Sequence, residues 1–172
     1  MFENVKLLII DVDGVLTDGK IIYDNDGTEL KCFDVKDGLG LYLLHKAGLK
    51  TAIVTGRESE IVDKRARELH FTRVYQNVKN KLKVFDALLA EFSLSPDETC
   101  YVGDDLPDLP VIIASGIGVA VADAVDEVKN AADFICSKTG GAGAIREVAE
   151  QILKAQGKWD DLVKNFLPVI EQ

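Results

Sequence analysis

Short apolar runs along the chain alternate with longer segments in which apolar residues recur at helical spacing. The runs are typical of buried strands in a parallel sheet, and they lie at 7–10, 51–54, 99–102 and 117–121. Two shorter runs, 74–75 and 134–136, are also expected to be strands. The amphipathic segments predict helices at 37–48, 59–69, 80–92, 124–132 and 144–155. Strands that alternate with helices predict an α/β fold, a doubly wound and mostly parallel Rossmann-like sheet with helices on both faces.

Two β-prone stretches on either side of Asp24-Asn25-Asp26-Gly27 predict a β-hairpin at about 19–35, because an Asp-Gly pair favours a tight turn. The hairpin follows the first strand closely and is expected to project over the mouth of any site there. In the next helix we expect Asp37 to be the N-cap and Gly48 the end, with Leu39, Tyr42, Leu43 and Leu44 on the packed face.

The length of 172 residues suits one domain, and we expect 1–172 to form a single one with a C-terminal tail at about 157–172. The formal net charge of -9 argues against a nucleic-acid partner and against binding to an anionic membrane surface. Cys32, Cys100 and Cys136 lack C-x-x-C spacing and are expected to be reduced thiols. With no secretory leader pattern and no apolar run of membrane-spanning length, the sequence predicts a cytoplasmic protein.

Polar residues gather where the predicted strands end, which is the edge of an open α/β sheet at which ligands bind. They are Asp11 and Asp13 after the first strand, Thr55 after the second, Lys81 at a helix start, and Asp104, Asp105 and Asp108 after the strand at 99–102. Each has an ordinary alternative when taken singly. Thr55 is a possible helix cap, Lys81 a surface amine, and the last two acids suit a first helical turn. Their shared edge favours a common site.

Several carboxylates at one edge repel each other, so a cation is expected among them. Hard oxygen ligands without a neighbouring His or Cys favour Mg²⁺. Such an arrangement suits phosphoryl transfer, in which positioning and charge neutralisation do most of the catalysis. In this interpretation Asp11 attacks phosphorus to form an acyl phosphate, and Asp13 protonates the leaving oxygen and later deprotonates water.

Asp11-Val12-Asp13-Gly14, Thr55, Lys81 and Gly103-Asp104-Asp105-Leu106-Pro107-Asp108 resemble, in order, the four motifs of the haloacid dehalogenase superfamily of phosphatases. The resemblance spans residues 5 to about 156. It implies that Asp11 is the nucleophile and a metal ligand, that Asp13 is the acid/base and binds Mg²⁺ through its backbone carbonyl, and that Asp104 is a further ligand.

The same resemblance implies roles for the remaining residues of the motifs. Thr55, Gly56 and Lys81 would hold the transferring phosphoryl group, with Asp105 and Asp108 in supporting positions. Lys79 and Lys83 flank Lys81, and either is an alternative for its role. Arg57 and Arg65 are the expected substrate-binding cations.

There is no room for a cap domain between the motifs. Val15-Leu16-Thr17-Asp18-Gly19, the hairpin, Thr55-Gly56-Arg57 and the motif at 140–147 resemble a capless branch of the superfamily. That branch hydrolyses 3-deoxy-D-manno-octulosonate 8-phosphate in lipopolysaccharide biosynthesis, and its members are homotetramers in which hairpins associate. The resemblance implies that this chain hydrolyses the same sugar-acid phosphate, as its small-molecule partner, and that it forms a homotetramer. Ala142, where relatives carry Arg, and His70-Phe71, in place of a Gly-containing turn, depart from the pattern.

Three other functions compete with this one. Phosphatases of nine-carbon, sialic-acid-type 9-phosphates share the motifs but carry an acid where Arg57 stands, so Arg57 favours the eight-carbon sugar. A receiver domain of signal transduction has its acceptor Asp on the third strand and its Lys last, unlike the order here. A catalytically idle oligomerisation module is disfavoured because Asp11 and Asp13 are both present.

Overall fold

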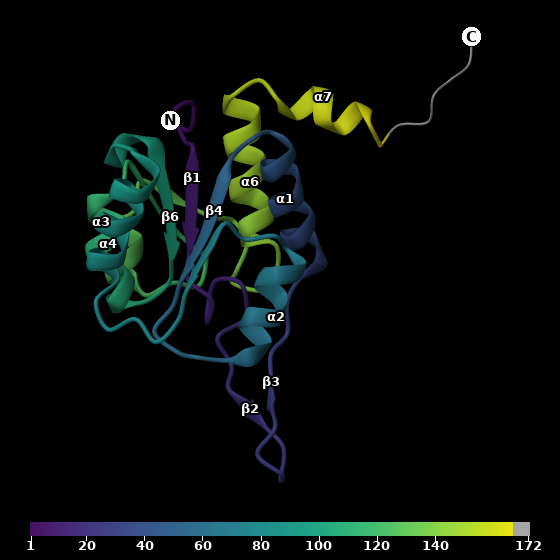
Figure 1. Ribbon diagram of the computed structural model, residues 1–172, viewed down its shortest axis with the longest axis vertical. Coiled ribbons are helices and arrows are strands. Elements are labelled where there is room, and N and C mark those ends of the chain that lie inside the picture. The colour runs from purple at the N-terminus through teal and green to yellow at the C-terminus, as the bar shows by residue number, and fades with distance from the viewer. Residues whose placement is uncertain (167–172) are drawn as a thin grey trace.

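A six-stranded parallel sheet runs through the computed structural model, which describes residues 1–166 (Figure 1). The strand order is β5-β4-β1-β6-β7-β8, and every neighbouring pair is parallel. The strands are β1 (Leu7–Ile10), β4 (Lys50–Val54), β5 (Arg73–Tyr75), β6 (Thr99–Gly103), β7 (Ile117–Ala120) and β8 (Phe134–Ile135). The predicted fold class is therefore confirmed.

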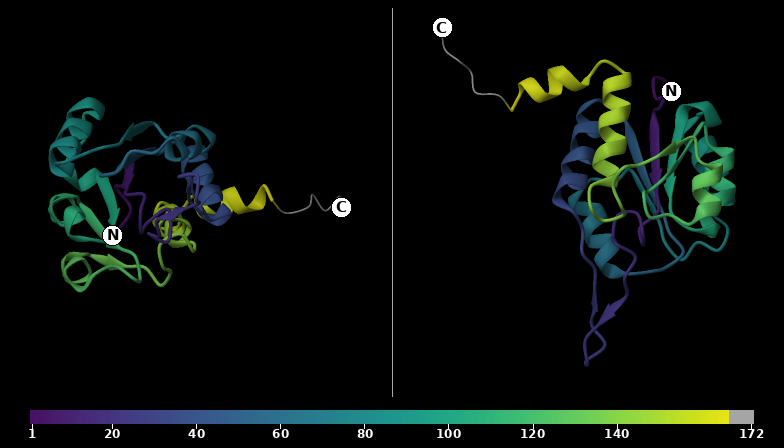
Figure 2. Two further views of the ribbon diagram at one scale, coloured as in Figure 1. Left: turned by 90° about the horizontal axis from the view of Figure 1, so that it is seen from below. Right: turned by 180° about the vertical axis from the view of Figure 1, so that it is seen from behind.

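Helices cover both faces of the sheet. They are α1 (Val35–Lys46), α2 (Glu60–Glu68), α3 (Lys81–Phe92), α4 (Leu109–Ala114), α5 (Asp126–Ala131), α6 (Ala144–Ala155) and α7 (Trp159–Lys164), with 3-10 turns η1 (Pro96–Glu98) and η2 (Leu106–Asp108). Helices α1, α2 and α6 lie on one side, and α3 and α4 on the other, as the view from behind also shows (Figures 1 and 2). Within residues 1–166 no helix is long and apolar enough to cross a membrane.

The central strand β1 is fully buried, because helices cover it on both faces. Its last residue, Ile10, pairs in register with Ile53 of β4 and with Val102 of β6. Three neighbouring strands therefore end at nearly the same level. The polar residues that follow them are brought to one edge of the sheet.

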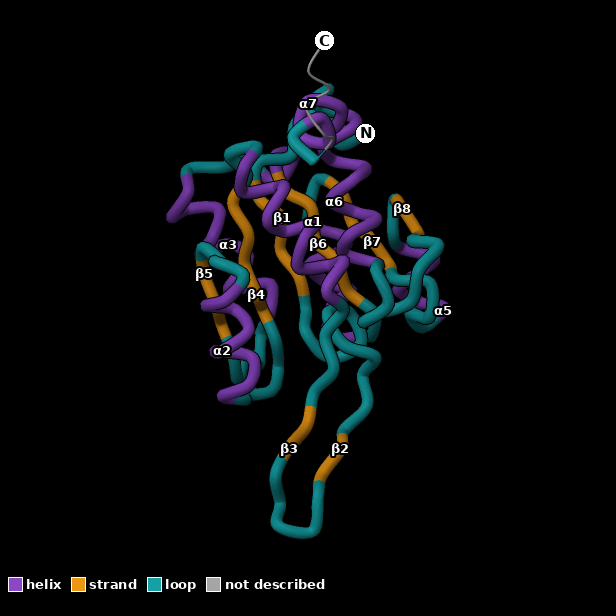
Figure 3. The backbone as a smooth tube through the Cα atoms, turned by 90° about the vertical axis from the view of Figure 1, so that its right-hand side faces the viewer, coloured by secondary structure: helices purple, strands orange, loops and turns teal. Residues whose placement is uncertain are grey.

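The predicted hairpin consists of β2 (Ile22–Tyr23) and β3 (Glu29–Leu30), which pair antiparallel. Gly27 adopts a φ of 82° in its turn, a conformation that glycine takes without strain. The hairpin projects beyond the carboxyl ends of the strands, on the side opposite α7 (Figures 1 and 3).

Helix α1 differs from its prediction in its start and in its packed face. Asp34 is the N-cap, since its side chain accepts a hydrogen bond from the Lys36 backbone N–H at 2.7 Å, and Asp37 is buried in the first turn. Leu39 and Tyr42 are 38% and 47% exposed, so their predicted packing was wrong. The helix packs against α6 as well as the sheet, and this double contact buries Leu41 together with the correctly predicted Leu43 and Leu44.

Two further local features bear on the predictions. His70 adopts a left-handed φ of 57° in the turn after α2, the conformation that glycine would take there without strain. Within the predicted tail, Trp159 of α7 contacts two cations of α6: Arg146 Cζ and Lys154 Nζ lie 5.4 and 5.2 Å from the centroid of its ring. Residues 167–172 of that tail lie outside the described residues.

Candidate active site

A cavity of about 340 Å³ lies at the carboxyl edge of the sheet. It brings together residues that are far apart in the sequence but follow the ends of β1, β4 and β6 or begin α3. Nine of the ten predicted site residues line it: Asp11, Asp13, Thr55, Gly56, Arg57, Lys81, Asp104, Asp105 and Asp108.

Lys81 is the cation at the bottom of this cavity. It opens α3 directly after the N-cap Asn80, and its Nζ lies 2.8 Å from Asp11 Oδ2 and 2.6 Å from Asp108 Oδ1. Its side chain is only 5% exposed, and a buried ammonium is tolerated when anions surround it. Lys79 and Lys83, the alternatives for its role, are exposed.

Asp108 organises the loop around the site. Its Oδ1 accepts hydrogen bonds from Lys81 Nζ and from the Tyr101 hydroxyl at 2.5 Å. Its Oδ2 accepts from the backbone N–H groups of Asp104 at 3.0 Å and Asp105 at 3.3 Å. Tyr101 is fully buried in β6, and nothing in its apolar sequence context signals this contact. With four donors, the Asp108 carboxylate fixes both Lys81 and the loop after β6.

Asp104 presents a carboxylate that accepts no hydrogen bond from residues 1–166. Ligand oxygens of Asp11, Asp104 and Asp108 all lie within 4.8 Å of one another. Burial, followed by the charges of Asp108 and Asp11, raises the pKa of Asp104 to about 8. Burial and the charge of Asp108 also raise the pKa of Asp11 to about 6, although Lys81 opposes them. One lysine therefore does not neutralise the cluster.

The donor set fits Mg²⁺. The cluster offers carboxylate oxygens and contains no His or Cys, which suits a hard cation that keeps several waters. Asp11 and Asp104 can supply carboxylate oxygens, because each Asp11 oxygen has a single partner, the Val12 N–H or Lys81 Nζ. Each oxygen of Asp108, in contrast, already has two donors. The backbone carbonyl of Asp13 accepts no hydrogen bond from the described residues and is available as well.

The Asp13 side chain contacts Lys31, a residue that was not predicted from the sequence. Lys31 Nζ forms an ion pair with Asp13 Oδ1 and lies 3.7 Å from Glu29 Oε1. Lys31 directly follows the hairpin strand β3, and its sequence context contained no signal beyond a lysine in a β-prone arm. The hairpin therefore contributes a cation to the site.

Arg57 joins the loop after β4 to the same hairpin. Its Nη2 lies 2.6 Å from Glu29 Oε1 and 3.3 Å from the Tyr23 hydroxyl, and Ser59 Oγ lies 2.9 Å from Glu29 Oε2. The other terminal nitrogen, Nη1, is buried and donates to no residue in 1–166. Arg57 thus ties the hairpin to the wall of the cavity.

Arg65 is not brought to this cavity. It lies on α2, where its guanidinium stands 5.8 Å from the ring of Phe33 and 3.2 Å from Glu68 Oε2. Within a single copy of residues 1–166, Arg65 therefore does not reach the cavity in which it was predicted to bind substrate.

The glycine motif at 140–143 supports the loop after β1 from behind. Gly141 donates its N–H to the Val15 carbonyl at 3.0 Å, and Gly140 donates to Asp123 Oδ1 at 3.0 Å. A side chain on Gly140 would lie 1.8 Å from the carbonyl oxygen of Gly14, so only glycine fits there. Neither glycine lines the site cavity.

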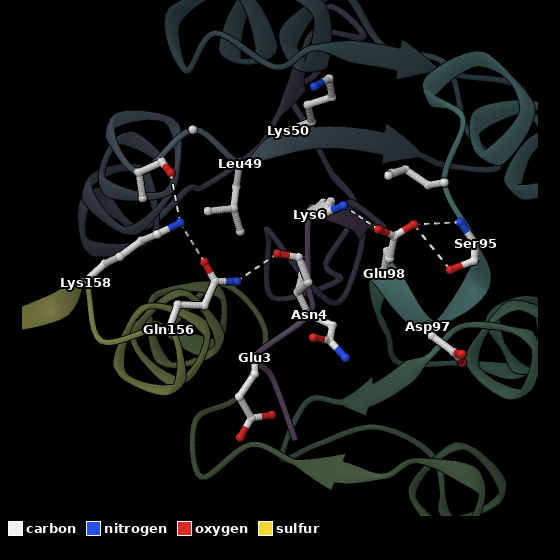
Figure 4. A pocket seen from close by; sticks show the side chains of 14 residues that line it. Glu3, Asn4, Lys6, Leu49, Lys50, Ser95, Asp97, Glu98, Gln156 and Lys158 are labelled. Atoms are coloured by element: carbon white, nitrogen blue, oxygen red, sulfur yellow. Dashed lines mark hydrogen bonds and ion pairs between the residues drawn. The ribbon is translucent and has the colours of Figure 1, made fainter.

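A larger cavity, of about 730 Å³, lies at the opposite edge of the sheet (Figure 4). Lys6 and Glu98, at the starts of β1 and β6, pair there at 2.5 Å. Lys158 donates to Gln156 Oε1 at 2.8 Å and to the Ala47 carbonyl at 3.2 Å. Lys6 and Glu98 are thus engaged with each other and Lys158 with neutral oxygens, and this cavity lies at the edge of the sheet opposite Asp11. Cavity size alone therefore does not mark the site.

An acidic cluster with a buried lysine, at the carboxyl edge of a parallel sheet, defines a hydrolase of the haloacid dehalogenase type. Residues 68–148 match the family model of haloacid dehalogenase-like hydrolases.

Over 159 residues the chain is 46% identical to the 3-deoxy-D-manno-octulosonate 8-phosphate phosphatase KdsC of Escherichia coli K12, covering 92% of this chain and 85% of that protein. A Moraxella catarrhalis phosphatase of the same name, crystallised with magnesium, phosphate and KDO, has a TM-score of 0.94 at 43% identity, covering 96% and 95% of the two chains. The cobalt-bound Haemophilus influenzae phosphatase has a TM-score of 0.91 at 41% identity, covering 97% and 99%. The chain belongs to the 3-deoxy-D-manno-octulosonate 8-phosphate phosphatase family.

Proposed function

We propose that this chain hydrolyses 3-deoxy-D-manno-octulosonate 8-phosphate to the free sugar acid and phosphate, through a phosphorylated Asp11, in lipopolysaccharide biosynthesis. The convergence of Asp11, Lys81 and Asp104 on one cavity carries this proposal, because these groups suit an in-line attack on a phosphate ester. The similarity to KdsC over most of the chain supports the choice of substrate.

In the first displacement, an Asp11 carboxylate oxygen forms a bond to phosphorus while the bond from phosphorus to the sugar oxygen breaks. Asp13 gives its proton to that leaving oxygen. Lys81, Thr55 and Gly56 hold the phosphoryl oxygens in line with Asp11. Magnesium bound by Asp11, Asp104 and the backbone carbonyl of Asp13 would neutralise negative charge on the phosphoryl group.

In the second displacement, Asp13 accepts a proton from water, whose oxygen attacks phosphorus and releases Asp11 as a carboxylate. Asp13 then carries the proton for the next cycle, so the two steps balance. Asp108 acts through others, since it holds Lys81 and the backbone of Asp104 by hydrogen bonds. Asp105 supports the same loop by accepting a hydrogen bond from the Leu106 N–H at 2.8 Å.

Arg57 provides the contact that distinguishes a sugar acid from an ordinary sugar. Arg57 lines the cavity and its Nη1 has no acceptor among residues 1–166, and a guanidinium suits a carboxylate. The absence of the Arg expected where Ala142 stands would remove a further contact to the carboxylate or to a neighbouring subunit.

A homotetramer is the proposed assembly, with the hairpins packed together. The hairpin exposes Ile21, Ile22, Tyr23 and Leu30, which are 58%, 40%, 59% and 52% exposed in the single chain. An apolar patch of this kind favours association with another protein surface. Three free cysteines suit the reducing cytoplasm, which is the proposed compartment.

The test is a phosphate-release assay with Mg²⁺ on three substrates: 3-deoxy-D-manno-octulosonate 8-phosphate, a nine-carbon sialic-acid-type 9-phosphate and glucose 6-phosphate. The eight-carbon substrate is expected to give the highest kcat/KM. A higher kcat/KM for the nine-carbon ester would show that this ester is the substrate instead. A higher kcat/KM for glucose 6-phosphate would contradict the proposal that Arg57 selects a sugar acid.

A further inference from the structure

Lys31 is a buried cation that the reaction scheme leaves unused. Its side chain is 1% exposed, although the strand before it belongs to a hairpin that projects from the fold (Figure 3). Its Nζ contacts Asp13 Oδ1, and the next carboxylate oxygen, Glu29 Oε1, lies 3.7 Å away.

Glu29 already serves two other donors. Its Oε1 accepts from Arg57 Nη2 at 2.6 Å, and its Oε2 accepts from Ser59 Oγ at 2.9 Å. Asp13 accepts a side-chain hydrogen bond from Lys31 and from no other side chain in residues 1–166. The pair of Lys31 and Asp13 is therefore a dedicated contact, since each charge has its closest partner in the other.

We propose that Lys31 is the positioning residue for Asp13 in the hydrolysis of a sugar phosphate. This inference rests on the proposed function. By holding Oδ1, Lys31 fixes the carboxyl group and leaves Oδ2 as the oxygen that carries the proton.

The proton balance follows from this choice of oxygen. As the bond from phosphorus to the sugar oxygen breaks and the bond to Asp11 forms, the proton on Asp13 Oδ2 moves to the sugar oxygen. In the second displacement, Oδ2 takes a proton from the attacking water. Lys31 keeps its own protons throughout and acts only through Asp13.

A positioning role for Lys31 has a consequence that a purely structural role lacks. A sugar alkoxide is a strong base and leaves only when it is protonated, whereas p-nitrophenolate leaves readily as an anion. Misplacing Asp13 should therefore slow the first displacement of the sugar phosphate much more than that of p-nitrophenyl phosphate. Comparing kcat/KM isolates this step, since kcat/KM reports the reaction up to the first irreversible event.

The experiment compares Lys31→Met and Lys31→Arg with wild type on both substrates in Mg²⁺. Lys20→Met is the matched control, because Lys20 is a 73% exposed lysine near the same hairpin that pairs with Asp18. Lys31→Met is expected to lower kcat/KM for the octulosonate 8-phosphate about ten- to a hundredfold and for p-nitrophenyl phosphate less than about threefold. Lys31→Arg should recover most of the loss, and Lys20→Met should change neither value.

Equal losses on both substrates would overturn the inference, as would an unchanged kcat/KM for the sugar phosphate. If Lys31→Met does not fold, Lys31→Gln takes its place, because its amide can still donate to Asp13. A smaller loss with the same substrate selectivity is then expected, and an equal loss on both substrates again overturns the inference. Failure of the proposed function is distinguishable, since wild type would then hydrolyse p-nitrophenyl phosphate but not the octulosonate 8-phosphate.

Discussion

Replacing Asp104 with Asn is expected to stabilise the metal-free protein while removing its response to Mg²⁺. An oxygen of the Asp104 carboxylate lies within 4.8 Å of oxygens of Asp11 and Asp108. The Asp104 carboxylate accepts no hydrogen bond from residues 1–166. Burial and these two charges raise the pKa of Asp104 to about 8. Asn keeps the shape of the side chain and is uncharged in both the folded and the unfolded chain, so folding no longer requires a proton to be taken up and no cavity is left.

The magnitude follows from proton linkage. At pH 7 the unfolded chain has released the Asp104 proton, since the ordinary pKa is 3.8, whereas the folded metal-free chain still holds it. That difference costs the folded state about 4 kcal/mol at pH 7, and the cost grows as the pH rises from about 4 toward 8. Because the loop is partly exposed, we halve the figure to about 2 kcal/mol, which is about 4 to 8 °C in Tm for a chain of this size.

Urea unfolding at pH 7, in EDTA and in Mg²⁺, measures both effects. Wild type should gain about 2.7 kcal/mol at a Mg²⁺ concentration of about 100 times Kd, and Asp104→Asn should gain none. Asp105→Asn is the control, because this exposed neighbour should keep the Mg²⁺ response and lose at most about 1 kcal/mol as a cap. The reasoning is refuted if Asp104→Asn is less stable than wild type in EDTA, or if Mg²⁺ stabilises wild type and Asp104→Asn equally.

Three further outcomes are expected. Arg57→Ala should narrow the preference for the octulosonate 8-phosphate over glucose 6-phosphate about ten- to a hundredfold in kcat/KM, and an unchanged ratio would contradict its contact with the sugar carboxylate. EDTA should abolish phosphate release and Mg²⁺ should restore it, so activity that persists in EDTA would contradict the metal assignment. Burial, with the charge of Asp34 adding to it, raises the pKa of Asp37 to about 6, so wild type should lose stability in urea unfolding as the pH rises from about 4 to about 6. Asp37→Asn should lose less, and identical pH dependence of the two proteins would contradict this reasoning.

The sequence was most informative for strands that are buried on both faces of the sheet, because such strands are continuous apolar runs. The apolar run at 7–10 and the polar residues after it predicted both the central strand and the edge at which the site forms. Lys81 was predicted at a helix start, and its pairing with Asp11 follows from the parallel order of the strands.

Prediction failed where a residue's environment depends on two elements at once. The buried face of α1 is set jointly by the sheet and α6, so a single helical period misplaced Tyr42. Lys31 reaches Asp13 because of the orientation of the whole hairpin, which no local pattern encodes. Tyr101 is similar, since an apolar strand gives no sign that one hydroxyl meets Asp108.

The most direct test of the account is to trap the phosphorylated enzyme. Asp13→Asn reacted with p-nitrophenyl phosphate should complete the first displacement, which needs little acid help, and stall before water attacks. Acid quenching, digestion and mass spectrometry are predicted to find one phosphoryl group on the peptide that contains Asp11, and none in an Asp11→Asn, Asp13→Asn double variant. Release of p-nitrophenol by Asp13→Asn with no phosphorylated peptide, or with the phosphoryl group on another residue, would contradict Asp11 as the nucleophile.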